Sequence, residues 1–302
     1  MSLQVRKVQF DFADDVPFMW HPGNPTFAVM ANMISILAIA FEKYIVAVVR
    51  QAMPQFTEPD VVAEADAFLR QEAQHARVHR QHLKALYRRW PGLQHTVDEA
   101  IRCFDEMLAA KSLRYHLAYI ADLEATFTPT FKLFLDHEAD LFRPGDDRVA
   151  SMFLWHFVEE VEHRSSALIL YRALGWSEAY RLAMLPSVAL HMHRVLHVIV
   201  TGFNEHVPLA DRQIDARVLL PGFQARHALR SLVPFGKRPA PLPDPFACVS
   251  PGARQAATRG ILQSQLPNHD PEDQPLPAFA AAWFDRYARG GDVAHWYSAE
   301  PS

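Results

Sequence analysis

The chain has 302 residues, of which 50% are hydrophobic and 21% are charged, and its formal net charge is −4. This composition is typical of a soluble globular protein with a sizeable core, and it excludes a disordered chain. Because the charge is slightly negative and no basic stretch stands out, we do not expect nucleic acid as a partner.

The predicted elements begin with an extended or irregular lead at residues 1–24, where VRKVQFDF alternates and HPGNP ends the segment in a turn. A helical pattern then continues from Pro25 to about Gly202, interrupted mainly at proline and glycine. One predicted helix is long for a globular protein, so we expect it to break near Lys111-Ser112. The predicted helices span 25–53, 58–89, 94–141, 146–174 and 177–203.

The composition changes after residue 230, where PFGKRPAPLPDPF and LPNHDPEDQPLP are rich in proline. We expect an irregular tail that wraps over the helices and contains a short helix at 276–289. The predicted fold class is all-α, an antiparallel helical bundle with additional helices and this proline-rich C-terminal tail. We expect one domain over 1–302, made of a lead at 1–24, a helical body at 25–205 and a tail at 206–302.

Two apolar stretches resemble membrane spans, but one contains Glu42 and Lys43 and the other contains Arg194. Charge inside a membrane is costly, so both are interpreted as buried helices, with amphipathic contact to a membrane surface as the disfavoured alternative. The N-terminal stretch has no hydrophobic segment of the kind that directs secretion. Cys103 and Cys248 have no neighbouring cysteine, which indicates neither a disulfide framework nor a thiolate metal site and fits the cytoplasm.

Acidic and histidine residues recur inside the predicted helices in a pattern that bundles use for paired metals. That pattern is a glutamate from each of two helices and Glu-x-x-His from each of the other two, because the i, i+3 spacing stacks both side chains on one face. The chain has EAQH at 72–75 and EVEH at 160–163. Glu42 and Glu124 lie on apolar helix faces, where a carboxylate must be neutralised, paired or bound to a cation.

A single such motif usually means solvated surface charge, but two motifs and two apolar-face glutamates in this order predict a site for two metal ions. Carboxylate and imidazole ligands without thiolates suit iron best, with manganese as an alternative and zinc less suited. Outside this set, His79 is interpreted as a packed core residue rather than an eighth ligand. Glu159 and Glu162 should be outer partners of the ligands or solvated, and Asp122 either orients a ligand histidine or is a surface acid.

The chain resembles the bacterial family of "predicted metal-dependent hydrolases", with a ferritin-like bundle, at VRKVQFDF, FEKYIVAVVR, FLRQEAQHARVH and WHFVEEVEHRSSA, over about residues 5–205. HFVEEVEH is also similar in spacing to the di-iron arylamine N-oxygenases, which carry a third histidine four residues before the second Glu-x-x-His glutamate. This second resemblance implies His156 as an added ligand. The predicted metal ligands are Glu42, Glu72, His75, Glu124, His156, Glu160 and His163.

The leading functional hypothesis is a di-iron oxidase or oxygenase that acts with dioxygen on a small apolar or aromatic molecule, and that needs an electron donor if it is an oxygenase. The first alternative is a metal-dependent hydrolase that uses a metal-bound hydroxide, as the family description implies. The second is a metal-storage or metal-sensing bundle without turnover, and a homodimer is left open. The substrate pocket is expected to be lined by Phe68, Phe127, Phe153 and Phe157.

Overall fold

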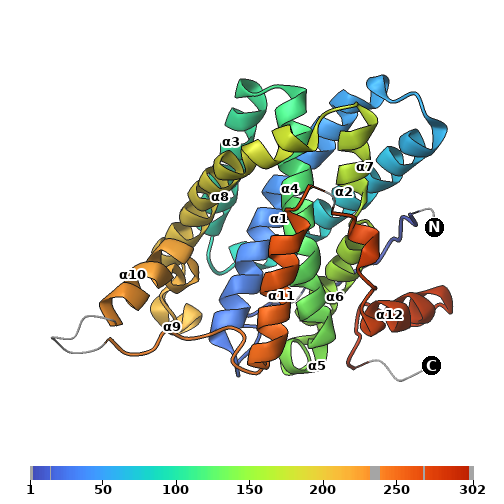
Figure 1. Ribbon diagram of the computed structural model, residues 1–302. Helices are drawn as coiled ribbons and strands as arrows, with labels where there is room; N and C mark the ends of the chain where they lie inside the picture. The colour runs from blue at the N-terminus through green and yellow to red at the C-terminus, as the bar shows by residue number, and fades with distance from the viewer. Residues whose placement is uncertain (1–2, 14, 232–238, 268, 299–302) are drawn as a thin grey trace.

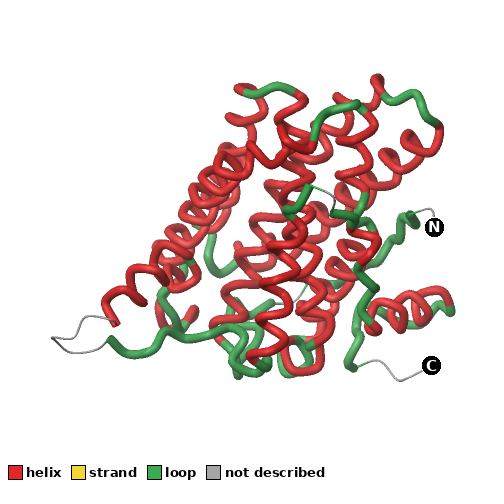
Figure 2. The backbone as a smooth tube through the Cα atoms, viewed as in Figure 1, coloured by secondary structure: helices red, strands yellow, loops and turns green. Residues whose placement is uncertain are grey.

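The computed structural model describes residues 3–13, 15–231, 239–267 and 269–298, and every regular element in these ranges is a helix (Figures 1 and 2). The predicted all-α class is therefore confirmed for the part of the chain that the structure describes. The proline-rich stretch predicted to be irregular begins at Pro234, and its first residues, up to 238, lie outside the described ranges.

The N-terminal lead is extended but pairs with no other strand among the described residues. The alternating sequence of the lead matches its burial: the residues between the buried ones are exposed. The buried residues are Arg6, Val8, Phe10 and Phe12. The lead therefore lies along the helices and turns every second side chain into the core.

Capping side chains mark the start of several helices. Pro25 opens the first helix after Asn24, whose side chain accepts a hydrogen bond from the Phe27 backbone N–H at 3.0 Å. Ser112 caps a new helix, which confirms the predicted break near Lys111-Ser112. The long helical elements are α1 (Pro25–Ala52), α2 (Pro59–Tyr87), α3 (Leu93–Ala110), α4 (Leu113–Asp136), α6 (Asp147–Glu162) and α8 (Glu178–His206).

One predicted helix, 146–174, is wrong as a continuous element. Helix α6 ends at Glu162, its C-cap His163 has a ψ of 16°, and the short helix α7 (Ser166–Ala173) begins after a turn. The turn redirects the chain so that α7 packs against both α2 and α4. His163 therefore sits at the end of a helix and not inside it.

Four helices form a closed ring around the interior of the molecule. Helix α1 packs on α2, α2 on α6, α6 on α4, and α4 returns to α1. The aromatic pair Phe27–Phe134, 5.9 Å between ring centroids, and the pair Phe41–Phe127, also 5.9 Å, show that α1 and α4 run antiparallel. These four helices also carry the predicted metal ligands.

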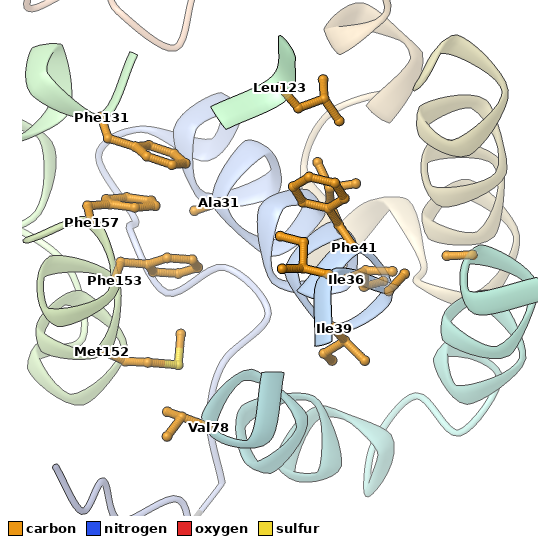
Figure 3. Close-up of a cluster of buried hydrophobic side chains, with 14 of the residues drawn as sticks. Ala31, Ile36, Ile39, Phe41, Val78, Leu123, Phe131, Met152, Phe153 and Phe157 are labelled. Atoms are coloured by element: carbon orange, nitrogen blue, oxygen red, sulfur yellow. The ribbon is translucent and has the colours of Figure 1, made fainter. Parts of the chain in front are cut away.

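Next to the predicted ligands, aromatic side chains fill part of the interior between α1, α4 and α6. Figure 3 shows Phe131, Phe157 and Phe153 in a row that points toward α1. The rings of Phe131 and Phe157 stack at 4.4 Å, and those of Phe153 and Phe157 at 5.7 Å. Such rings bury large apolar areas in fixed orientations, so they give the ring of helices a rigid centre.

The C-terminal part is more helical than expected. The predicted helix at 276–289 is present as α12 (Ala278–Ala288), but α10 (Pro221–Ser231) and α11 (Pro251–Ser264) are helical as well. Helix α11 begins where the Ser250 side chain accepts from the Ala253 N–H, and it packs along α4. The tail is therefore partly a further layer on the bundle (Figure 1). The short elements are η1 (Met53–Gln55), α5 (Glu138–Leu141), α9 (Leu209–Arg212), η2 (Ala216–Leu219) and η3 (Pro271–Asp273).

Two segments, Pro25–Gln55 and Glu178–His206, are long and apolar enough to cross a membrane by length and composition. The apolar window of the first is 72% buried, as expected for a core helix, but that of the second is only 28% buried. The expectation of a buried helix is thus wrong for most of α8, because α3 and α4 cover one side of it and leave the other side, with Leu190, exposed.

Candidate metal centre

Each helix of the four-helix ring delivers one buried glutamate to the same region. Glu42 comes from α1, Glu72 from α2, Glu124 from α4 and Glu160 from α6, and none of them is more than 5% exposed. Burying one carboxylate is costly unless it is paired, and burying four together requires compensating positive charge.

Three histidines complete two compact groups of side chains, in each of which one potential ligand atom per residue lies within 4.8 Å of the others. All seven residues proposed as ligands from the sequence lie in these groups, and their role as metal ligands stays a prediction. One group is Glu42, His75, His156 and Glu160, and the other is Glu72, Glu124 and His163.

Glu160 lies between the two groups. Its Oε1 atom is 3.0 Å from His156 Nε2, 3.4 Å from His75 Nδ1 and 3.5 Å from His163 Nε2. His156 Nε2 also lies 3.2 Å from Glu42 Oε1. One carboxylate oxygen therefore lies within 3.5 Å of histidines from both groups.

The second group is built around His163, whose position at the end of α6 lets its ring reach two other helices. Its Nε2 atom lies 3.2 Å from Glu72 Oε1 and 3.7 Å from Glu124 Oε2. On its other side, His163 Nδ1 lies 3.0 Å from Gln71 Oε1. The amide oxygen can only accept, so it fixes the proton on Nδ1 and leaves Nε2 free to bind a metal.

Several buried atoms of the centre have no hydrogen-bond partner among the described residues. They are both carboxylate oxygens of Glu72, Oε2 of Glu42, Nδ1 of His75 and Nε2 of His163. Buried polar atoms are rarely left unpaired, and oxygen and imidazole donors that converge on one space are the donor set of a divalent metal site. The residues present therefore fit a pair of metal ions.

The pKa values of two carboxyl groups in the centre are raised, because several carboxylates are buried close together. Burial and the nearby Glu160 carboxylate raise the pKa of Glu124 to about 7. The same two causes raise the pKa of Glu72 well above its ordinary value. In the metal-free protein Glu124 therefore holds a proton at mildly acidic pH, and this proton takes the place of a cation.

The pKa values of two histidines are also raised, although burial acts to lower them. Burial lowers the pKa of His156, but the carboxylates of Glu42 and Glu160 outweigh burial and raise it to about 9. The pKa of His163 is also raised against burial, mainly by Glu160. Burial tends to raise the pKa of Glu160, yet His163 and His156 hold it well below its usual range. Without metal, the positive charge of the centre is therefore carried by protonated imidazole rings.

A network of polar residues holds the ligands from outside. His75 Nε2 lies 2.9 Å from Glu159 Oε2, and the Arg6 guanidinium donates to Glu162 at 2.7 and 2.8 Å and to Glu159 at 3.5 Å. Gln71 donates to Glu162 at 3.0 Å. Of the two acids expected to be outer partners or solvated, Glu159 is fully buried and contacts the candidate ligand His75, whereas Glu162 is partly exposed and contacts Arg6 and Gln71.

The sequence interpretation missed Arg6 and Gln71 as parts of the site. Arg6 stands on the buried side of the alternating lead, and an arginine in that row signals a buried acidic partner. Gln71 precedes Glu72 and gives no signal by itself. Asp122 was expected to orient a ligand histidine or to be a surface acid, and both interpretations are wrong: it is buried and pairs with Arg181 at 2.7 Å.

A cavity of about 280 Å³ opens beside the centre and is bounded by α1, α4, α8 and the C-terminal segment. Glu42, Glu72, Glu124, His156 and Glu160 line one part of it, and apolar side chains form most of the rest. Of the four phenylalanines expected to line a pocket, Phe127 does, whereas Phe68 packs on His163 and Phe153 on His79. Phe157 belongs to the stacked row in Figure 3.

A family model described as "Predicted metal-dependent hydrolase" matches residues 4–237. The match includes the lead with Arg6 and all four helices that carry the candidate ligands, and it stops before α11 and α12. No curated protein and no solved structure matches the chain.

Proposed function

This chain belongs to the family of predicted metal-dependent hydrolases, and from that premise we propose that it is an enzyme that hydrolyses a small, mainly apolar molecule at a centre of two metal ions. The observation that carries the proposal is the convergence of four buried glutamates and three histidines on one space. We propose further that the four ligand helices have a ferritin-like topology, which their closed ring of contacts supports.

The residues divide naturally between the two ions. Glu42, His75 and His156 would hold one ion, Glu72, Glu124 and His163 would hold the other, and Glu160 would contact both. The four carboxylates carry four negative charges when ionised, which two divalent ions would balance while the histidines stay neutral. Iron or manganese remains the preferred metal for this donor set.

When bound, the ions would supply Lewis acidity, which polarises a substrate oxygen and lowers the pKa of a coordinated water. The chain's own residues supply the rest. Arg6 and Glu159 keep His75 in one orientation, and Gln71 does the same for His163. The apolar wall of the cavity excludes bulk water and places the substrate with its polar group toward the glutamates.

A second candidate is the di-iron oxidase or oxygenase expected from the spacing of His156, Glu160 and His163. The observation in its favour is that His156 Nε2 lies 3.0 Å from Glu160 Oε1 and 3.2 Å from Glu42 Oε1, among the other candidate ligands. This is the third histidine of the arylamine N-oxygenase pattern. Bound iron would supply dioxygen activation in this case, and the family description favours hydrolysis instead.

Metal analysis of the purified full chain followed by two assays tests these proposals. Hydrolysis predicts about two metal ions per chain and turnover of esters or amides with apolar acyl groups, lost on chelation and restored by metal. Oxidation predicts that the ferrous protein consumes dioxygen, with no ester or amide turnover. Iron loading without either activity supports storage and rejects both enzymes, and a protein that takes up no metal rejects the site itself.

A further inference from the structure

The residues that line the cavity beside the candidate centre extend along the helix axes of α1 and α4. On α1, its lining runs through Met30, Ile34 and Ala38 to Glu42, one stripe of the helix at a spacing of four residues. Because an α-helix rises 1.5 Å per residue, this stripe covers about 18 Å. The lining therefore follows α1 for more than three turns, and the cavity is called the channel below.

The two ends of the channel differ in chemistry. At one end stand the glutamates of the candidate centre, of which Glu42 and Glu124 come from the two antiparallel helices. At the other end, Phe134 of α4 stands opposite the start of α1. Glu124 and Phe134 are ten residues apart on α4, which corresponds to about 15 Å. The polar and the apolar end are thus separated by most of the channel's length.

The wall between these ends offers no charge and no free hydrogen-bond donor among the described residues. Apart from the candidate ligands, its only polar side chains are Thr126 and Thr130. Their hydroxyls donate to the backbone carbonyls of Asp122, at 2.9 Å, and Thr126, at 3.2 Å. Thr126 Oγ1 also accepts from Gln265 Nε2 at 2.9 Å, so the wall offers no free donor and its surface is almost wholly apolar.

Phe246 closes the apolar end. Its ring lies 5.6 Å from Phe134 and 6.4 Å from Phe27, between α4 and the first turn of α1. The Asn24 side chain holds this segment in place by donating to the Pro245 carbonyl at 2.9 Å. Phe246 lies outside the range 4–237 that the family model covers, so this closure is a feature of the chain's own C-terminal segment.

We propose that the channel binds a molecule with one unbranched apolar chain and one polar end, and that Phe246 limits the length of that chain. The polar end lies at the candidate metal centre and the apolar chain extends along α1 and α4 to Phe246. The identity of the reacting end rests on the proposed function, whereas the shape and length selection rest on the channel alone.

Calorimetric binding of plain alcohols to the full chain, with and without metal, tests the proposal apart from any turnover. The probes are hexanol, octanol, decanol and dodecanol, with adamantanol as a compact alcohol of ten carbons. Each buried methylene should tighten binding by about threefold to fourfold until the chain reaches Phe246. Decanol should bind more tightly than adamantanol. Tighter binding of adamantanol, or no dependence on chain length, would overturn the channel even if the protein proved to be a hydrolase.

Variants at residue 246 test whether Phe246 limits the length of the bound apolar chain. Phe246→Ala should extend the gain to at least one longer alcohol, and Phe246→Trp should end it at a shorter one. The matched control is Phe223→Ala, which removes a partly buried ring of α10 that does not line the channel, and it should leave the length preference unchanged. If Phe246→Ala does not fold, Phe246→Trp decides, and an unchanged length limit in the folded variants overturns the role of Phe246.

Discussion

His79 Nε2 lies 2.7 Å from His156 Nδ1, and both rings are buried. Because His156 Nε2 faces the carboxylates of the candidate centre, metal binding there places the remaining proton on Nδ1, which then donates to His79. His79 in turn donates from Nδ1 to Ser35 Oγ at 2.9 Å, and Ser35 donates to His82 Nδ1 at 3.3 Å. The hydrogen bonds thus all run in one direction and orient three imidazole rings. His79, expected to be a packed core residue, therefore also fixes the orientation of His156.

The first prediction is that His79→Phe lowers metal affinity about tenfold to a hundredfold, because the ring is kept but the acceptor that fixes the His156 tautomer is lost. Competition with a chelator of known affinity measures this. His82→Phe is the matched control, since His82 is the last residue of this series of hydrogen bonds and its loss should change the metal affinity far less. Equal losses in both variants would contradict the tautomer argument and indicate a packing effect.

The second prediction concerns Glu124. Glu124→Gln keeps the shape of the side chain but removes a negative charge from the second group, so metal content should fall by about half or more while the helical circular dichroism is retained. Glu99→Gln, on the surface of α3, is the control and should bind metal normally. Normal metal content in Glu124→Gln would remove this residue from the ligand set.

The third prediction separates a seven-ligand from a six-ligand centre. His156→Ala removes the histidine that is absent from the simple Glu-x-x-His pattern. If His156 binds metal, the variant should lose affinity for one ion about a hundredfold while it retains the other, and metal titration should resolve two unequal sites. Two unchanged sites would show that His156 serves only to hold Glu160 and Glu42.

Much of this arrangement could be predicted because its signals are local. Proline, glycine and capping residues mark most helix ends, and an acid on an apolar helix face marks a side chain that must find positive charge. Glu42 is such a case: its helical neighbours alone place it in the interior. The helix break after Glu162 has no proline or glycine to mark it, and it was missed for that reason.

The remaining features depend on contacts between distant parts of the chain. Arg6 and Glu162 are separated by 156 residues, and the sequence around each gives no sign that the two are partners. Phe246 reaches the channel only because the C-terminal segment crosses the end of α1, where Asn24 holds Pro245. Local pattern cannot predict such approaches, because they follow from how the packed helices leave surface for the rest of the chain to cover.

The fourth prediction is that Arg6→Ala destabilises the protein by about 3 kcal/mol, because it leaves Glu159 buried without its cationic partner. Urea unfolding measures this loss. Arg70→Ala is the control, since Arg70 forms an exposed pair with Asp66 and should cost far less. A loss in Arg6→Ala no larger than in the control would mean that the lead is not an anchor of the site.

The fifth prediction is that the stabilisation produced by metal grows as the pH rises from 5 to 8. The pKa of Glu124 is raised to about 7 in the metal-free fold, so its contribution is favourable below its unfolded pKa and is lost as the pH rises through 7. The raised pKa of His156, about 9, acts in the same direction at higher pH. Bound metal replaces these protons and removes the loss. The measurement is the difference in Tm between metal-loaded and chelated protein across this range, in which pH effects common to both forms cancel. A difference that shrinks as the pH rises would contradict the exchange of protons for metal at the centre.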